Sequence, residues 1–405
     1  MRLFPCKKGY RGETERAVPP SETLTTVEAK LPAAGITRVA DITSLDRIGI
    51  PVFSSIRPTA LNGAISVYNG KGATPTEAKV SAMMEGIERY SAEPGALPII
   101  RGTFNTLTAE YDVVDPATLI LPRNADPSAP LPWVEGFSVP DWTPVLLPAH
   151  AVFHPFMWEG PPLFRTNTNG LASGNTREEA VFHGLMEVVE RDAWSLAEAS
   201  RTTGNIVRVD TPGTGSDLLH KFAAAGVEVT VKDITSDLGI PTFAAVADDI
   251  TLRDPSLLTI GMGTHTKAGI ALVRALTEVA QSRLTQIHGA REDTTVAEFR
   301  RRIGYERTKR MNQYWFEGTG EVYLSSIPSC ESDDFLTDIE RTVRALNTAG
   351  FPRVLVVDLT RVEIGVPVVR VIVPGMEVFA MDGERIGKRC NDARNRRVPR
   401  PKPAS

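Results

Sequence analysis

Four glutamates occur as two pairs with the same three-residue spacing: Glu85 with Glu88, and Glu187 with Glu190. Residues three apart share one face of a helix, so the two carboxylates of each pair would project together. If two such helices faced each other, four carboxylates would converge, and they would repel unless cations lay among them. Carboxylate oxygens suit Mg²⁺, which usually also binds substrate phosphates. The spacing therefore predicts a site for magnesium and phosphate.

An arginine follows each pair, Arg89 after the first and Arg191 after the second. A guanidinium makes bidentate contacts with phosphate, which fits the same kind of site. The alternative for a single Glu-x-x-Glu-Arg is a solvated helix face, whose Glu–Arg pair contributes about 0.2–0.5 kcal/mol. Because the motif occurs twice, we favour a magnesium–phosphate site over a solvated helix face.

The repeat extends well beyond the charges. Residues 72–89 (GATPTEAKVSAMMEGIER) align without gaps with residues 174–191 (GNTREEAVFHGLMEVVER). Gly, Thr, Glu-Ala and Met-Glu-x-x-Glu-Arg coincide, which indicates a duplicated helical unit. We expect Glu85, Glu88, Arg89, Glu187, Glu190 and Arg191 to be the catalytic set, with the four glutamates as metal ligands.

A third segment, RALTEVAQSR at 274–283, repeats the spacing with Glu278 and Gln281, and Arg283 follows. These residues could bind nucleotide or metal, but an amphipathic helix with a polar stripe explains the pattern equally well. Nothing fits the phosphate loop G-x-x-x-x-G-K-[ST]. The glycine clusters at 69–72 and 261–263 are interpreted as turns.

Three long helices are predicted to carry these residues. The first spans 74–92, with Thr74 as N-cap, Pro75 at the first position and Glu77 completing a capping box. The second spans 176–198, with the same box from Thr176 and Glu179. The third spans 268–288.

The remaining chain is predicted to contain further strands and helices. Residues 94–165 are expected to contain short strands at best. From residue 388 onward the chain is basic and proline-rich, and is expected to be a flexible tail. Strands are predicted at 227–234, 241–249, 257–265, 353–359 and 366–374, and helices at 299–313 and 333–347.

Composition restricts the class of protein. The 405 residues are 42% hydrophobic and 23% charged, which is ordinary for a globular chain. A net charge of −4 argues against a general nucleic-acid binder, and no apolar run suggests a membrane span. The three cysteines form no metal-binding or redox spacing, and the polar N-terminus lacks a secretory segment. We therefore expect a cytoplasmic enzyme that needs sulfur from outside for any sulfur chemistry.

These blocks resemble the YcaO family. SAMMEGIER matches that family's S-x-x-x-E-x-x-E-R signature, beginning at Ser81. Residues 166–193 and 274–293 resemble its second and third ATP-binding blocks. KKGYRGETERAVPPSETL and GITRVADITSLDRIGIPV are similar to archaeal-type members, so the resemblance runs from about Lys7 to the end.

The resemblance implies an ATP- and Mg-dependent enzyme that activates a peptide backbone amide. It implies a YcaO-type fold, α/β (mixed α+β), with internally duplicated helical units packed on sheets. We expect one domain over 1–398, with duplicated units around 72–92 and 174–198, and a tail at 399–405. Members are commonly homodimers. The resemblance places nucleotide contacts at Lys8, Thr14, Arg16, Ser81, Arg89, Asn175, Arg191, Gln281 and Arg283, with Glu278 as a further candidate.

The branch of the family is predicted from finer features. The N-terminus, the VPGMEVF segment and the lack of a fused peptide-clamp domain resemble enzymes that thioamidate a glycine in the methyl-coenzyme M reductase alpha subunit. Those enzymes often work with a TfuA partner or another sulfur donor. Pro399, Pro401 and Pro403 instead resemble the C-terminal motif of azoline-forming cyclodehydratases, although a disordered proline-rich tail explains them equally well. A non-catalytic ATP-binding accessory protein is a third possibility.

Overall fold

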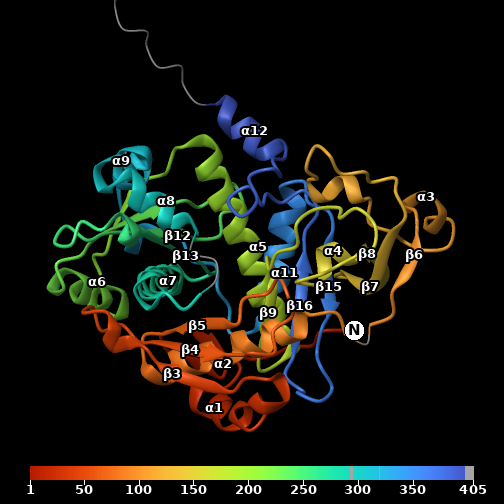
Figure 1. Ribbon diagram of the computed structural model, residues 1–405, viewed down its shortest axis with the longest axis horizontal. Helices are drawn as coiled ribbons and strands as arrows, with labels where there is room; N and C mark the ends of the chain where they lie inside the picture. Colours follow the sequence, from red (N-terminus) through yellow and green to blue (C-terminus); the bar gives the residue numbers. More distant parts are fainter. Residues whose placement is uncertain (96, 292–294, 319, 397–405) are drawn as a thin grey trace, which may run out of the picture.

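Three sheets form the scaffold of the protein in a computed structural model, which describes residues 1–95, 97–291, 295–318 and 320–396 (Figure 1). The smallest sheet has the order β3-β4-β5 and is antiparallel. A second has the order β13-β12-β11-β10-β14, in which only β10 and β14 are parallel. The third is antiparallel with the order β6-β7-β15-β16-β9, and β8 also pairs with β7.

The strands have the following bounds. The small sheet contains β3 (Arg38–Asp41), β4 (Val52–Ile56) and β5 (Val67–Lys71). The second contains β10 (Ile206–Arg208), β11 (Glu228–Asp233), β12 (Thr242–Asp248), β13 (Thr259–Thr264) and β14 (Glu321–Tyr323). The third contains β6 (Ile100–Gly102), β7 (Leu131–Val139), β8 (Thr143–Pro148), β9 (Leu171–Ser173), β15 (Val354–Asp358) and β16 (Val368–Ile372). Strands β1 (Tyr10–Arg11) and β2 (Glu15–Arg16) form an N-terminal hairpin.

Each sheet ends in an edge strand that leads directly into one long helix. Strand β5 precedes α2 (Pro75–Ala92), β9 precedes α5 (Arg177–Ser200), and β13 precedes α7 (Ala268–His288). Each helix turns back and packs against its own sheet. The three units bring α2, α5 and α7 together in the middle of the molecule (Figure 1). All three predicted long helices are confirmed.

Glycines allow the close contact between strand and helix in these units. A Cβ on Gly70 would lie 1.9 Å from the backbone nitrogen of Ala82, and one on Gly261 would lie 2.2 Å from that of Val279. Such a contact excludes any side chain, so the helix backbone rests on the strand backbone. The interpretation of both glycine clusters as turns was therefore wrong, since these glycines lie within β5 and β13.

The start of α2 is as predicted, but the start of α5 differs. Thr74 and Glu77 exchange both hydrogen bonds of a capping box. At α5 the Thr176 hydroxyl accepts from the nitrogen of Glu179, but the reciprocal bond is absent among the described contacts. The Glu179 carboxylate instead accepts from the nitrogen of Ala17, at 2.9 Å. It therefore holds the N-terminal segment against α5.

Three further expectations required correction. Residues 94–165 include β7, a nine-residue strand, because its apolar residues are buried between strands on either side. The helix expected at 299–313 is broken by Gly304, with φ of 80°, into α8 (Thr295–Ile303) and α9 (Tyr305–Met311). Residues 388–395 form α12 (Lys388–Asn395), because Cys390 is fully buried and the carboxylate of Glu377 accepts from its backbone nitrogen.

The remaining helices surround these units. They are α1 (Pro20–Glu28), α3 (Phe104–Leu107), α4 (Ala149–Val152), α6 (Thr214–Ala224), α10 (Gln313–Phe316) and α11 (Phe335–Thr348). Within the described ranges, no helix is both long and apolar enough to cross a membrane. The single-domain boundary at 398 stays a prediction, and the prolines at 399, 401 and 403 lie outside the described residues.

Candidate functional site

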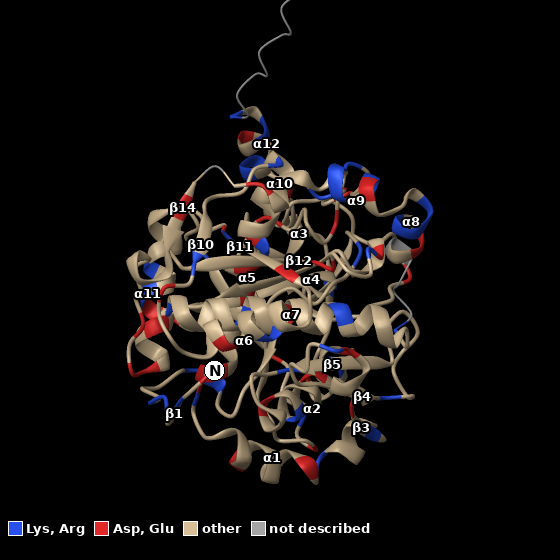
Figure 2. Cartoon of the chain, turned by 90° about the vertical axis from the view of Figure 1, so that its left-hand side faces the viewer, with Lys and Arg blue, Asp and Glu red and all other residues tan. Residues whose placement is uncertain are grey.

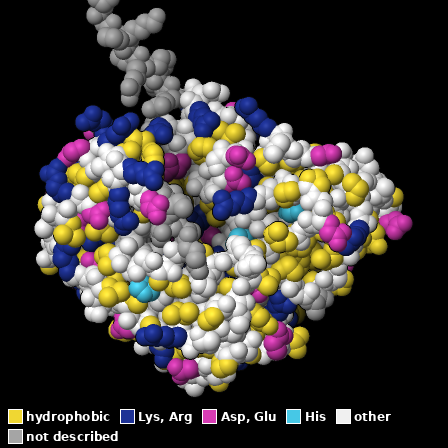
Figure 3. All heavy atoms as spheres, viewed as in Figure 1, with side chains coloured by type: hydrophobic (Ala, Val, Ile, Leu, Met, Phe, Trp, Pro, Cys, Tyr) yellow, Lys and Arg dark blue, Asp and Glu magenta, His cyan; other side chains and the backbone are white. Residues whose placement is uncertain are grey.

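A cavity of about 670 Å³ opens where α2, α5 and α7 meet beneath the N-terminal hairpin. It is hollowed into the face shown in Figure 3, near the centre of that view. Twelve of the fourteen predicted site residues line it. They are Thr14, Arg16, Ser81, Glu85, Glu88, Arg89, Asn175, Glu187, Glu190, Arg191, Glu278 and Gln281.

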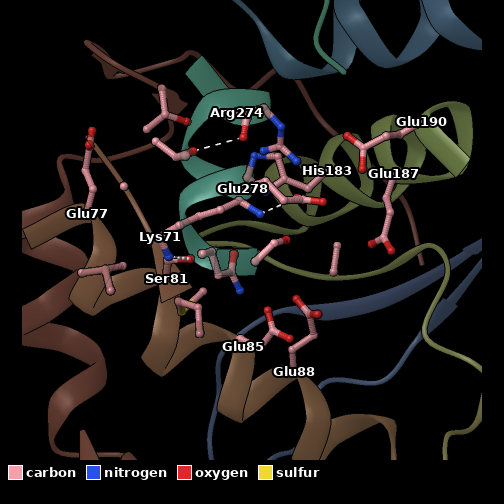
Figure 4. A pocket seen from close by; sticks show the side chains of 18 of the residues that line it. Lys71, Glu77, Ser81, Glu85, Glu88, His183, Glu187, Glu190, Arg274 and Glu278 are labelled. Atoms are coloured by element: carbon pink, nitrogen blue, oxygen red, sulfur yellow. Dashed lines mark hydrogen bonds and ion pairs between the residues drawn. The ribbon is translucent and has the colours of Figure 1, made fainter. Parts of the chain in front are cut away.

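The two glutamate pairs face each other across this cavity. Glu85 and Glu88 rise from α2, while Glu187 and Glu190 project from α5 toward them (Figure 4). Within each helix the arginine pairs with the first glutamate, at 2.7 Å in α2 and 3.6 Å in α5. The Glu88 carboxylate also accepts from the backbone nitrogen of Ser173 in β9, at 2.9 Å. The edge strand of one unit thus orients a carboxylate of another.

The carboxylates carry more negative charge than their surroundings stabilise. Burial, together with the nearby charge of Glu85, raises the pKa of Glu88 well above its usual value. Burial also raises the pKa of Glu187. Burial and the charge of Glu278 raise the pKa of Glu190 to about 7. Such clustered shifts are typical of functional sites.

Unsatisfied polar atoms test whether magnesium and phosphate fit this cavity. One carboxylate oxygen of Glu190 is buried without a hydrogen-bond partner in the described structure, as are the Nε atoms of Arg89, Arg191 and Arg274. Buried groups of this kind normally find a partner. The Glu190 oxygen suits a bound cation, and the three guanidinium nitrogens, which have no hydrogen-bond acceptor, suit the oxygens of a phosphate.

The donor set also suits magnesium in particular. Among the described residues, no three His, Cys, Asp or Glu side chains are arranged to hold a metal on their own. Mg²⁺ usually takes one or two carboxylates and completes its octahedron with water and substrate phosphates. The residues present therefore fit a metal that is held jointly by the protein and a nucleotide.

Helix α7 supplies the third wall. Glu278 pairs with Lys71, the last residue of β5, at 2.6 Å. Burial would raise the pKa of Glu278, but Lys71 and Arg191 outweigh it and lower the pKa. Gln281 donates to the backbone oxygen of Asn69. Of the two interpretations of this helix, its position favours the ligand-binding one.

The N-terminal hairpin closes one side of the cavity. Arg16 contacts the ring of His183 and lies 3.6 Å from the Glu179 carboxylate. Asn175 donates to the same carboxylate, at 3.0 Å. The Glu179 carboxylate therefore positions both Arg16 and Asn175, which are predicted nucleotide contacts.

Two predicted nucleotide contacts lie outside the cavity. The Lys8 ammonium is fully buried and pairs with Glu15 and with Asp338, the latter at 2.6 Å. Arg283 is fully buried on the opposite face of α7, between Asp46 at 3.0 Å and Asp249 at 3.1 Å. The structure therefore does not bring these two residues into the cavity, and both charges are paired within the protein.

Lys71, His183 and Arg274 are among the cavity residues that sequence reasoning missed. The gapless repeat aligns His183 with Ser81, so the duplication itself carried a signal for it. Arg274 lies four residues before Glu278, on the same helix face. Burial, followed by the charge of Arg16, lowers the pKa of His183 well below its usual value, so the ring is neutral.

The raised pKa values predict how metal binding depends on pH. Protons must leave the carboxylates before Mg²⁺ can bind. Because the pKa of Glu190 is about 7, affinity for Mg²⁺ with a non-hydrolysable ATP analogue should rise between about pH 6 and 8. Calorimetry in two buffers of different ionisation enthalpy should reveal proton release. An affinity that is constant over this range, without proton release, would contradict the assignment.

Comparison with known proteins supports the same interpretation. Residues 69–377 match the family described as YcaO cyclodehydratase, binding ATP and Mg²⁺. A protein of Methanothermobacter thermautotrophicus is 56% identical over 388 residues, which cover 93% of this chain and 99% of that protein. A protein of Rhizobium leguminosarum bv. trifolii from the tfuA 3′ region is 34% identical, covering 90% and 89%.

A solved structure shares the fold. YcaO from Methanopyrus kandleri, bound with AMPPCP and Mg²⁺, superposes with a TM-score of 0.80 at 31% identity, covering 95% of this chain and 98% of that one. The predicted mixed α/β fold is confirmed, as are ATP and Mg²⁺ as cofactors of the matched family.

Proposed function

Because this chain belongs to the YcaO family, whose members are ATP-dependent peptide-modifying enzymes, we propose that it converts a backbone amide of a protein substrate into a thioamide. ATP would activate the amide oxygen, and sulfide would be the nucleophile. We propose thioglycine formation in a protein such as methyl-coenzyme M reductase, with a TfuA-type protein or another sulfur donor as partner. A homodimer is the proposed assembly.

The observation that carries the proposal is the convergence of duplicated charges in one cavity. Four carboxylates and two guanidiniums from α2 and α5 line it from facing sides (Figure 4), and α7 adds Glu278 and Gln281. Of the residues that line the cavity, Glu190, Arg89 and Arg191 contribute buried polar atoms that have no hydrogen-bond partner in the described structure. This arrangement suits a nucleoside triphosphate whose γ-phosphate is transferred.

The reaction would proceed in two balanced steps. Hydrosulfide forms a bond from sulfur to the carbonyl carbon, and the amide oxygen takes the γ-phosphate as ADP leaves. The carbon–oxygen bond then breaks with phosphate as leaving group, sulfur loses its proton, and the carbon–sulfur double bond forms. Arg89 and Arg191 would hold the phosphates, and Glu85, Glu88, Glu187 and Glu190 would hold Mg²⁺, which neutralises charge on the transferring group.

The cysteines favour an external sulfur source. None of the three is among the residues that line the cavity. Cys390, a residue of α12, is fully buried, and burial, followed by the charge of Glu377, strongly raises the pKa of its thiol. A thiol that resists ionisation is a poor nucleophile. The relative in the tfuA 3′ region is consistent with sulfur delivery by a partner.

The second candidate is azoline formation, in which a Cys, Ser or Thr side chain of the substrate peptide is the nucleophile. It is favoured by the description of the matched family as a cyclodehydratase. The activation step would be the same, so the two candidates differ only in the attacking atom and the product.

Intact-mass analysis of a glycine-containing substrate peptide, incubated with the enzyme, ATP, Mg²⁺ and sulfide, tests the proposal. We expect exchange of one oxygen for sulfur, together with ADP release that depends on the peptide. A parallel reaction with a non-hydrolysable ATP analogue should give no product. Loss of one water at a Cys, Ser or Thr of the peptide would show that the product is an azoline and not a thioamide. Nucleotide binding without turnover or mass change would favour an accessory protein.

A further inference from the structure

Helices α8 and α9 concentrate positive charge on a chain that is negative overall. Residues 295–311 contain six basic and two acidic residues, whereas the whole chain has a net charge of −4. Lys and Arg positions, coloured blue, are prominent on the ribbons of both helices in Figure 2, and basic side chains gather in the upper left of Figure 3, where Figure 1 places these helices. The pair therefore forms a basic projection from the fold.

The inner side of this projection is tied to the five-stranded sheet. Arg300 donates to the backbone oxygen of Leu258, at 3.1 Å. Tyr305 and Lys309 both contact the carboxylate of Asp248 at the end of β12, at 2.6 Å. The helices are thus fixed in place, and half of their basic side chains are not needed for this attachment.

The outer side lacks partners. Arg302, Arg307 and Arg310 are exposed and form no ion pair or side-chain hydrogen bond with any described residue. Phe299 and Met311 lie among them in sequence and are 54% and 46% exposed. In α9, Arg307, Arg310 and Met311 have the spacing of one helix face. We call these five residues the α8–α9 face.

One helix of the α8–α9 face also reaches the cavity. Ala297 and Arg300, which belong to the same helix α8, line the cavity wall. A macromolecule that docks on this face would therefore contact a helix that also forms part of the cavity wall. Exposed arginine, phenylalanine and methionine are also the residue types enriched at protein interfaces.

We propose that the α8–α9 face docks a protein partner with an acidic, partly apolar surface and places it at the cavity mouth. Charge excludes symmetric pairing with a second copy, since two basic faces would repel. Phe299 and Met311 together suit the apolar part of a protein interface, whereas a nucleic-acid duplex would be held mainly by phosphate contacts of the arginines. This proposal does not depend on the thioamide chemistry, because it concerns association only.

Binding of defined acidic peptides to the full chain tests the proposal. The probes are two fluorescent peptides of about 20 residues, one of glutamate and one repeating Glu-Glu-Leu, followed by anisotropy at low and moderate salt. We expect both to bind, the leucine-containing one more tightly. The triple variant Arg302→Glu, Arg307→Glu, Arg310→Glu should bind both at least about tenfold more weakly. Phe299→Ser with Met311→Ser should remove only the preference for leucine.

The matched control carries the same change of charge elsewhere, at exposed Arg38, Arg123 and Arg344. It should bind nearly as the wild type does, and circular dichroism should show every variant folded. Hydrogen exchange should locate protection by the peptide on α8 and α9. Equal weakening in the control, protection elsewhere, or no binding by the wild type would overturn the proposal. Tighter binding of single-stranded DNA than of either peptide would overturn it in favour of nucleic acid.

Discussion

The variant Glu190→Gln is expected to abolish measurable ATP turnover, a loss of about a hundredfold or more, while the fold stays intact. Glu190 is 3% exposed, and one of its carboxylate oxygens has no hydrogen-bond partner in the described structure. Glutamine keeps the shape but removes the negative charge that would hold Mg²⁺ against the phosphates. Peptide-dependent ADP release and circular dichroism, measured on one preparation, check this expectation.

The control for this experiment lies on the same helix. Glu198 is two turns further along α5 and accepts from Tyr314, at 2.6 Å, outside the cavity. Glu198→Gln should therefore retain ATP turnover. Glu85→Gln should behave as Glu190→Gln does, because it removes charge from the facing pair. If either cavity variant turned over ATP as fast as the wild type does, the assignment of these glutamates as magnesium ligands would be wrong.

Replacement of Arg283 by methionine should destabilise the protein by about 3–5 kcal/mol rather than weaken nucleotide binding. The change would leave Asp46 without its guanidinium partner and would deprive Asp249 of one of two. Breaking a buried ion pair from one side leaves an uncompensated charge, which costs more than the pair itself contributes. Urea unfolding, followed at equilibrium, measures the loss.

Gln281 provides the matched comparison, two residues earlier on the same helix but on the cavity wall. Gln281→Leu should weaken binding of a non-hydrolysable ATP analogue and change the unfolding midpoint much less than Arg283→Met. The opposite pattern, with lost binding in the Arg283 variant at unchanged stability, would restore Arg283 as a nucleotide contact.

The sequence by itself determined the repeated unit and the composition of the site. Caps, apolar periodicity and the gapless repeat predicted α2, α5 and α7, because these signals act within one helix and need no partner. The repeat placed Glu85, Glu88, Glu187 and Glu190 in one kind of environment, since identical neighbours build similar surroundings. The matched family binds ATP and Mg²⁺, as the carboxylate pairs predicted.

Only the tertiary structure decided which side of a helix each residue serves. Gln281 and Arg283 are two positions apart on α7, so they point in different directions, one into the cavity and the other into a buried ion pair. The Glu179 carboxylate does not make the expected capping bond. It accepts instead from the backbone nitrogen of Ala17, which is distant in sequence but close in space. Gly70 and Gly261 look like turn residues until a helix is placed against their strands. Each outcome depends on contacts between segments far apart in the chain, which local spacing does not encode.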